Sequence, residues 1–501
     1  MPPSPEQSEI AAAFETGRVS GVRLAAPRID THISHVFLTA TRAYKLKRAV
    51  RLPFVDFSTL AQRHAACRAE LDVNRRFAGE MYLAVRPVRR TGPDTYSLGE
   101  GDGEPLDWVV EMQRFDPSSQ FDELAARGGL TPEMIDATAD MIAAAHRDCP
   151  AVTSAGHTAD YRGILHELRA TETHGAHEQG LMPGEPDIFR ELDIALARID
   201  PLVEARRRAG KVRRTHGDLH LRNICLFNGR PTPFDALEFD ERMATTDVLY
   251  DLAFLLMDLA RIGHRSAAGR LMNRYWDMAG EDEAALAILP FFMALRAGVR
   301  MAVDIEAGKV AEADTYRQLA RQLMDRAPPV ALAIGGLSGS GKSTIARQLA
   351  PRLPGAAGAR LLRSDMIRKR ALDLNPQETL SAPGAYSSAA RGAVYERLFE
   401  HGRTAFVAGC SVILDATFQE DAMRRALSTR MDPAPLGVWL DLPLDQRLAR
   451  IAGRRADASD ADARVARRQD APEELPPGWH RIDASGTPEE VADRVMALVT
   501  S

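Results

Sequence analysis

Short runs in which apolar and polar residues alternate dominate the chain between about residues 30 and 115. These runs predict β-strands over residues 33–39, 42–46, 83–89, 95–98 and 107–113, with one helix near residues 57–77. After Ser118 the pattern is mostly helical, and only a predicted hairpin over residues 224–235 interrupts it. This order predicts a β-rich small lobe at about residues 25–115 and a larger helical lobe at about residues 116–327.

A boundary follows the helical lobe at two adjacent prolines, Pro328 and Pro329. Adjacent prolines cannot continue a helix, so they indicate a short, stiff linker. The apolar run Val330–Ile334 behind them reads as a buried strand that leads into a glycine-rich loop. We therefore expect one domain over residues 1–327 and a second over residues 328–501.

Composition narrows the class of protein further. A length of 501 residues predicts roughly two to four domains. With 45% hydrophobic and 27% charged residues, the chain is an ordinary globular one, which excludes collagen-like, disordered and disulfide-scaffold classes. The formal net charge of −5 argues against a general polyanion binder but leaves a local basic groove possible.

Cysteine spacing and hydropathy bear on the compartment. The four cysteines, Cys67, Cys149, Cys225 and Cys410, show no C-x-x-C spacing, which favours a reducing compartment without a zinc or disulfide framework. The N-terminal residues lack a basic region followed by an apolar one, as a signal peptide would have. The longest apolar run, residues 284–295, is shorter than the roughly 20 residues that span a bilayer. We expect a cytoplasmic protein with no membrane partner.

The loop after Val330–Ile334 matches the phosphate-binding pattern G-x-x-x-x-G-K-[ST] in full, and it follows a predicted strand and opens a predicted helix. Backbone N–H groups in such a loop turn inward around phosphate, the lysine reaches the β- and γ-phosphates, and the hydroxyl after it binds Mg²⁺. A flexible Gly/Ser turn is the alternative. The residues expected to contact ATP are Gly336, Ser338, Gly339, Ser340, Gly341, Lys342, Ser343 and Thr344.

Two acids end apolar runs in the same domain. Asp415 closes the run Ser411–Leu414 in the manner of a Walker B acid, so we expect it to bind Mg²⁺; alternatively, it caps a strand end. Asp365 follows the run Arg360–Arg363, where open α/β sheets place ligands. Asp365 either accepts the proton of a substrate hydroxyl or caps a helix that begins at Met366, and the sequence leaves both open.

An arginine-rich stretch lies between residues 447 and 468. It reads as a lid over the phosphates, from which we select Arg454 as an ATP contact, or as a solvated helical face. These motifs together resemble the small P-loop kinases of the predicted-kinase, zeta-toxin and gluconate-kinase-like group over residues 330–500. The resemblance implies phosphoryl transfer from ATP to a hydroxyl and assigns site roles to Lys342, Ser343, Asp365 and Asp415. Blocks typical of AAA+ motors are not evident, which favours a kinase over a mechanical ATPase.

A second constellation lies in the first domain. His216-Gly-Asp218-Leu-His-Leu-Arg-Asn223 matches the H-x-D-x-x-x-x-N catalytic loop, whose acid takes the proton of the attacking hydroxyl and whose amide oxygen binds a metal. The dipeptide Asn228-Gly229 between apolar runs predicts a hairpin. That hairpin would return Asp235 beside Asn223, so that the two share Mg²⁺.

This second constellation resembles the aminoglycoside-phosphotransferase, kinase-like family, in the version fused to a P-loop kinase, over about residues 25–310. The resemblance implies Asp218 as catalytic base, Asn223 and Asp235 as metal ligands, and Asp247 and Asp251 as supports of the loop. It also implies a small-lobe lysine that contacts ATP.

Two lysines, Lys45 and Lys47, lie on one predicted strand, and the two-residue period sends both to one face. We favour Lys45, with Lys47 as the substitute and Glu70 as their partner; a lysine-decorated edge strand is the alternative. The stretch Thr31–Val36 has no glycine, so the glycine-rich kinase loop is missing.

The sequence therefore predicts an α+β bilobal kinase-like domain followed by an α/β P-loop kinase domain with a parallel sheet flanked by helices. The leading hypothesis is a bifunctional, ATP- and Mg²⁺-dependent phosphotransferase that acts on hydroxyls of small metabolites. The alternative is a P-loop small-molecule or polynucleotide-end kinase regulated by a ligand-sensing, catalytically weak first domain. Nucleic acid is not expected as a partner.

Overall fold

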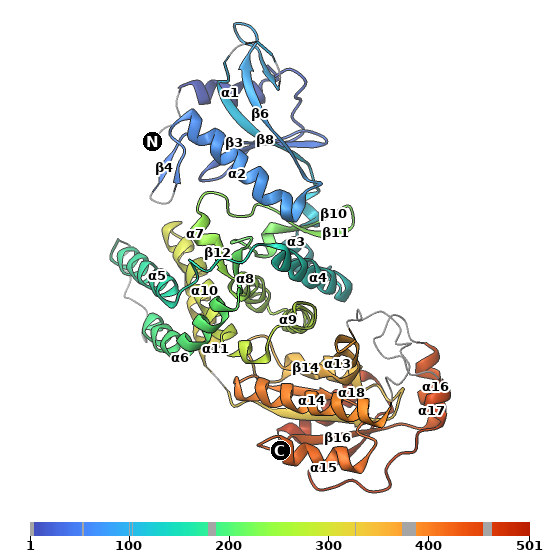
Figure 1. Cartoon of the computed structure of the whole chain (residues 1–501). Helices are drawn as coiled ribbons and strands as arrows, with labels where there is room; N and C mark the ends of the chain where they lie inside the picture. The colour runs from blue at the N-terminus through green and yellow to red at the C-terminus, as the bar shows by residue number, and fades with distance from the viewer. Residues whose placement is uncertain are drawn as a thin grey trace. The chain divides into compact units, whose positions relative to one another are not determined.

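A computed structural model describes residues 5–52, 55–99, 101–102, 104–178, 187–325, 327–372, 387–453 and 463–500 (Figure 1). Its contacts divide the chain into two compact units. The first unit is Met1–Tyr161 with Val203–Asp258, and the second is Arg162–Leu202 with Leu259–Ser501. The boundary near residue 328 stays a prediction. Within the described residues no helix is long and apolar enough to cross a membrane.

A six-stranded antiparallel sheet forms the start of the first unit, in the order β1-β2-β3-β8-β6-β7. The strands are β1 (Ile29–Asp30), β2 (Ser34–Leu38), β3 (Arg42–Lys47), β6 (Tyr82–Arg90), β7 (Tyr96–Leu98) and β8 (Asp107–Gln113). A small hairpin of β4 (Arg51–Leu52) and β5 (Val55–Asp56) follows β3. The five strands expected here are all present.

A helix packs on each face of this sheet. Helix α2 (Leu60–Ala78) lies across one face, where Val110 of β8 joins its core (Figure 1). Its N-cap Thr59 exchanges hydrogen bonds with Gln62 in a capping box, which is why the helix begins at Leu60 and not near residue 57. Helix α1 (Pro5–Glu15) covers the other face together with Val109, because successive strand residues point to opposite sides.

The remainder of the first unit is mostly helical and carries the loop of residues 216–223. Its elements are α3 (Phe121–Ala126), α4 (Pro132–Asp148), β9 (Val212–Arg214), β10 (Ile224–Phe227), β11 (Arg230–Pro233), α7 (Glu241–Ala244), β12 (Thr245–Asp247) and the start of α8 (Val248–Arg261). Strands β10 and β11 form the expected hairpin about Asn228-Gly229. Strand β9 pairs with β12 and leads directly into His216.

The part of the second unit that precedes its sheet in the sequence is helical. Its helices are α9 (Arg265–Ala279), α10 (Leu289–Glu306) and α11 (Val310–Met324), with parts of α5 (Thr158–Glu178) and α6 (Ile188–Arg208). Helix α10 is buried along most of its length and packs against α11. A short 3₁₀ turn, Glu283–Ala287, joins α9 to α10.

The second unit also contains a five-stranded parallel sheet in the order β14-β15-β13-β16-β17. The strands are β13 (Ala331–Gly336), β14 (Arg360–Arg363), β15 (Val412–Asp415), β16 (Leu436–Asp441) and β17 (Trp479–Asp483). Four of them coincide with the predicted apolar runs, which confirms the parallel α/β fold. Strand β17 was not predicted, because it is an edge strand whose residues are mostly exposed and polar.

Helices cover both faces of this parallel sheet. They are α12 (Lys342–Leu349), α13 (Ser364–Arg370), α14 (Ser388–Val407), α15 (Asp421–Arg430), α16 (Leu444–Ala452), α17 (Ala463–Arg467) and α18 (Pro488–Val499). Ile413 of β15 joins a core with α12 and α18, whereas Leu414 lies against Gly402 of α14 on the opposite face. The strands are parallel, so their carboxyl ends lie along one edge of the sheet. Consecutive strands β13 and β14 lie on different sides of β15, and open α/β sheets place ligands at such a point.

Candidate active sites

Both lysines of strand β3 contact the same carboxylate. Lys45 Nζ lies 2.9 Å from Glu70 Oε1, and Lys47 Nζ forms an ion pair with Glu70 Oε2. Glu70 is fully buried on α2, and burial alone would raise the pKa of its carboxyl group. The charges of Lys45 and Lys47 outweigh burial and lower the pKa of Glu70 to about 2. Glu70 is therefore an anion that orders two ammonium groups.

The second partners of the two lysines differ. Lys45 Nζ also lies 2.5 Å from Asp235 Oδ1, whose side chain is 45% exposed. Lys47 instead pairs with Glu238, and both of these side chains are almost completely buried. Lys45 therefore faces the open end of the site, and Lys47 lies behind it.

Glu238 was not identified from the sequence. A signal was present, because the run Phe234-Asp-Ala-Leu-Glu-Phe239 places an acid between apolar residues, where a buried charge needs a partner. Burial raises the pKa of Glu238, although Lys47 opposes this effect. Lys47, which forms the ion pair with Glu238, lies far away in the sequence, so residue spacing alone did not reveal the pair.

Asp251 of α8 holds the loop of residues 216–223 through its backbone. Its carboxylate accepts hydrogen bonds from the N–H groups of His216, at 3.3 Å, and Gly217, at 2.8 Å. His146 Nε2 lies 3.1 Å from the same carboxylate. Gly217 has a φ of +84°, and a Cβ there would lie 2.8 Å from the Cβ of Ala244, so the loop requires glycine at this position.

Asp247 supports the same region from β12. Both of its oxygens accept hydrogen bonds from the Arg206 guanidinium, at 2.7 and 2.8 Å, and one also accepts the N–H of Leu249. Asp247 and Arg206 are both buried, and a bidentate pair of this kind fixes geometry as well as charge. Asp251 therefore contacts the loop directly, whereas Asp247 joins α6 to α8.

Asp218 and Asn223 converge within the loop. Asn223 Nδ2 donates to the backbone oxygen of Asp218 and to its Oδ2, both at 2.9 Å. His220 Nε2 lies 3.4 Å from the same Oδ2. The Asp218 side chain is 39% exposed, so a hydroxyl group can reach its carboxylate. This arrangement is suited to general-base chemistry.

The β10–β11 hairpin returns the chain to Asn223, whose carbonyl accepts the N–H of Phe234 at 2.9 Å. The next residue, Asp235, has a φ of +60°, and its N–H donates to the Tyr82 hydroxyl at 3.1 Å. A positive φ at a non-glycine residue is costly and persists where the surroundings hold it. The Asn223 amide and the Asp235 carboxylate are hard oxygen donors, so this pair fits Mg²⁺.

The turn between β1 and β2 lies where a kinase glycine-rich loop is expected. Thr31 closes it, because its N–H donates to the Ser34 carbonyl and its hydroxyl accepts the Ser34 N–H, both at 2.9 Å. His35 Nδ1 lies 2.6 Å from Asp30 Oδ1. Side-chain hydrogen bonds hold this turn, and it contains no glycine.

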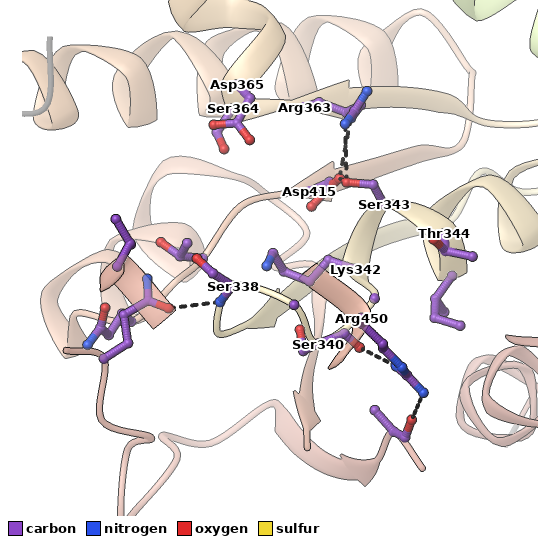
Figure 2. A pocket seen from close by; sticks show the side chains of 18 of the residues that line it. Ser338, Ser340, Lys342, Ser343, Thr344, Arg363, Ser364, Asp365, Asp415 and Arg450 are labelled. Atoms are coloured by element: carbon purple, nitrogen blue, oxygen red, sulfur yellow. Dashed lines mark hydrogen bonds and ion pairs between the residues drawn. The ribbon is translucent and has the colours of Figure 1, made fainter. Parts of the chain in front are cut away.

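The phosphate-binding loop connects β13 to α12 and lines a cavity of about 930 Å³ (Figure 2). Gly339 has a φ of +88°, and a Cβ there would lie 2.6 Å from the Arg447 carbonyl oxygen, so only glycine fits. Seven of the eight residues predicted to contact ATP here line the cavity: Ser338, Gly339, Ser340, Gly341, Lys342, Ser343 and Thr344. Gly336 ends β13 and is not among the lining residues.

Ser343 and Asp415 meet at the carboxyl ends of the strands. Ser343 Oγ donates to Asp415 Oδ2 at 2.5 Å, and Arg363 lies beside both, with its Nη2 3.4 Å from Ser343 Oγ (Figure 2). The hydroxyl and the carboxylate are oxygen donors of the type that Mg²⁺ takes beside phosphates, so this pair fits the ion. Lys342 Nζ donates to the Leu337 carbonyl at 3.2 Å and lines the same cavity.

Asp365 lies in the first turn of α13, on the cavity wall. The helix begins at Ser364 with Arg363 as its N-cap and no side-chain capping bond, so the interpretation of Asp365 as an N-cap is wrong. The Asp365 carboxylate instead pairs with Arg368 Nη1 at 2.8 Å. Arg363 was not singled out from the sequence; its place at a strand end, directly before Ser364-Asp365, was the available signal.

Two arginines of α16 support the phosphate-binding loop. Arg450 Nη1 donates to the Ser340 carbonyl at 3.2 Å and Arg447 Nη1 to the Ser338 carbonyl at 3.4 Å. Arg447 is buried, whereas Arg450 lines the cavity. Arg454, the predicted lid contact, lies outside the described residues.

Comparison with known proteins identifies two regions. The model of the phosphotransferase enzyme family matches residues 35–287, and a model described as an AAA domain matches residues 332–476. Uncharacterized proteins of Mycobacterium tuberculosis (strain H37Rv) and Mycobacterium bovis are each 29% identical to this chain over 476 residues, which is 91% of this chain and 92% of theirs.

Two solved structures are similar to parts of this chain. The GDP complex of an aminoglycoside 2′-phosphotransferase covers 64% of this chain and 99% of its own, at 12% identity and a TM-score of 0.39. A gluconokinase from Sinorhizobium meliloti 1021 covers 34% of this chain and 92% of its own, at 16% identity and a TM-score of 0.26.

Proposed function

Because this chain belongs to the phosphotransferase enzyme family, we propose that it is a bifunctional kinase with one catalytic site in each unit. Each site would transfer the γ-phosphoryl group of ATP to a hydroxyl of a small molecule. One observation carries the proposal: in each unit a lysine, a pair of Mg²⁺-type oxygen donors and a separate accessible carboxylate come from adjacent elements. Phosphoryl transfer needs these groups, because its catalysis is mainly positioning and charge stabilisation.

In the first unit Asp218 would accept the hydroxyl proton as the oxygen attacks the γ-phosphorus and the β–γ bridging bond breaks. Lys45 faces the site and would bind the phosphates, while Glu70 holds its ammonium group. Asn223 and Asp235 would hold Mg²⁺, which neutralises phosphate charge when bound. Asp251 keeps the loop in place through two backbone N–H groups.

In the second unit the loop N–H groups and Lys342 would bind the phosphates at the N-terminus of α12. Ser343 and Asp415 would hold Mg²⁺. Asp365 would take the acceptor proton, and Arg368 orients its carboxylate at 2.8 Å. Sites for small ligands measure about 300–1,000 Å³, and the cavity of about 930 Å³ lies near the upper limit. That volume has room for a nucleotide beside a small-molecule acceptor.

The test is phosphorylation of a metabolite extract with γ-labelled ATP by the full chain. We compare the wild type with Asp218→Asn and Lys342→Ala, which disable one site each. Two product sets, each lost in only one variant, are expected. A single product set that survives Asp218→Asn unchanged would exclude catalysis in the first unit.

A second candidate function is a ligand-sensing first unit that regulates the P-loop kinase. The turn between β1 and β2 favours it, because side-chain hydrogen bonds hold this turn where a glycine-rich phosphate cover is expected. In the Lys342→Ala chain, a titration with ATP measures nucleotide binding by the first unit alone. Tight binding without turnover on any acceptor supports regulation, whereas turnover supports the bifunctional enzyme.

A further inference from the structure

Helix α9 contacts β14, an edge strand of the parallel sheet. The side-chain amide of Asn273 on α9 takes the place of a neighbouring strand. Its Oδ1 accepts the N–H of Leu361 at 2.7 Å, and its Nδ2 donates to the carbonyl of Ala359 at 3.0 Å. Backbone N–H and C=O groups on the outer side of an edge strand have no partner strand. Here one side-chain amide forms hydrogen bonds with one such donor and one such acceptor.

A buried ion-pair network fixes the same contact. Arg360 of β14 is 1% exposed, and its Nε and Nη2 donate to the two oxygens of Glu283, at 2.9 and 3.1 Å. Arg360 Nη2 also donates to Asp277 Oδ1 at 2.7 Å. Glu283 belongs to the turn after α9, and Asp277 to α9 itself. A bidentate pair of this kind sets orientation as well as charge.

A second arginine holds the other end of the same segment. Arg370, the last residue of α13, donates from Nη2 to the backbone carbonyls of Trp276, at 3.1 Å, and Asp277, at 2.6 Å. These carbonyls belong to the last turn of α9, whose negative dipole end attracts cations, and the Trp276 carbonyl also accepts the N–H of Gly280 at 3.1 Å. The segment 360–370 is therefore attached to α9 at its first and last residues.

The attached segment forms one wall of the catalytic cavity. Arg363, Asp365 and Arg368 lie between the two attachment points and line the cavity. The phosphate-binding loop is supported differently, by Arg447 and Arg450 of α16. The two walls of the cavity thus have separate supports.

We propose that α9 is a positioning element of the P-loop site, and that Arg360 and Arg370 are the positioning residues through which it sets the place of Asp365 relative to the phosphates. The assignment rests on the proposed function of that site. Loss of either arginine would displace the acceptor wall and leave nucleotide binding intact.

The experiment uses the full chain with Arg360→Met, with Arg370→Ala as a milder second variant because its side chain is 41% exposed. Arg430→Met is the matched control, since its pair with Glu396 is exposed on both sides. Hydrogen exchange is followed in peptides that cover residues 360–370 and 331–336. Mg-ATP hydrolysis, in which water replaces the acceptor hydroxyl, is measured with every variant in the Asp218→Asn background, so that kcat and KM belong to the P-loop site.

In both test variants we expect exchange over residues 360–370 to rise at least about tenfold, with residues 331–336 unchanged. We expect kcat to fall about tenfold or more at a KM for ATP within about twofold, because misplacement acts on the reaction and not on nucleotide binding. The control should match its parent chain. Unchanged exchange in both variants, or raised exchange with an unchanged kcat, overturns the proposal.

A failure of the proposed function gives a different result. Hydrolysis in the Asp218→Asn background would then be insensitive to Lys342→Ala. The exchange measurement does not depend on activity and still decides whether α9 holds the segment.

Discussion

Replacing Lys47 by methionine removes the cation that lies between Glu70 and Glu238. Glu70 keeps Lys45 at 2.9 Å, but Glu238, whose side chain is 4% exposed, loses the lysine that it contacts. Breaking a buried ion pair from one side costs about 3–5 kcal/mol. Methionine keeps an unbranched side chain as far as Cε and loses only the ammonium group, which lies 5.6 Å from the centre of the Phe57 ring, so most of this cost is electrostatic.

The matched change at Lys45 has a different consequence. Its second partner, Asp235, is 45% exposed and is solvated by water when the lysine is lost, while Glu70 keeps Lys47. We expect Lys45→Met to cost about 1–3 kcal/mol of stability and to abolish phosphoryl transfer at the first site. On this prediction, the two lysines, two residues apart on one strand, differ in role: Lys45 acts in catalysis and Lys47 in stability.

Hydrogen exchange in the full chain measures both effects. At about 1.4 kcal/mol per tenfold change, Lys47→Met should speed exchange in β3 and α2 by roughly two to four orders of magnitude. Peptides from β13 in the other unit serve as the internal reference. Adding Glu238→Gln to Lys47→Met should recover part of the loss, because no unpaired charge then remains. The reasoning is refuted if Lys45→Met destabilises the unit more than Lys47→Met does.

Three further predictions concern other contacts. Asp251→Asn weakens the acceptor for two loop N–H groups, so first-site kcat should fall about 10- to 100-fold with little change in KM for ATP, measured by steady-state kinetics. Burial alone would raise the pKa of Glu283, but Arg360 outweighs burial and holds this pKa below the ordinary 4.5. The ion pair therefore stabilises the fold above pH 4.5, and this stabilisation is lost as the pH falls through the lowered pKa. Glu283→Gln should make the free energy of unfolding in urea depend less on pH in this acid range. Asp415→Asn should raise the Mg²⁺ concentration needed for half-maximal activity of the P-loop site at least about tenfold in a Mg²⁺ titration, whereas an unchanged midpoint would contradict its role.

Local patterns in the sequence were enough for much of this structure. The alternation in β3 anticipates that Lys45 and Lys47 share a face, because a strand has a period of two whatever its partners are. The loop before α12 follows from its glycines and from the apolar run ahead of it. The Asn-Gly turn predicts the hairpin that leads to Asp235.

Features that depend on distant partners could not be read in this way. The Lys47–Glu238 pair joins residues 191 positions apart, and Arg360 meets Glu283 across 77 positions. Helix α1 was missed because its helical pattern is weak and its burial comes from packing on the sheet. Strand β17 lacks an apolar run because one of its sides has no neighbouring strand.

The attachment of β14 to α9 also determines where the chain can be cut. A fragment that starts at Pro328 would retain Arg360 and lose Glu283, Asp277 and Asn273. Its sheet would then present a bare edge strand and a buried cation without its carboxylates, both of which favour aggregation or misfolding. A fragment that starts at Leu259, ahead of α9, would keep these partners, although it would lack residues 162–202 of the same unit.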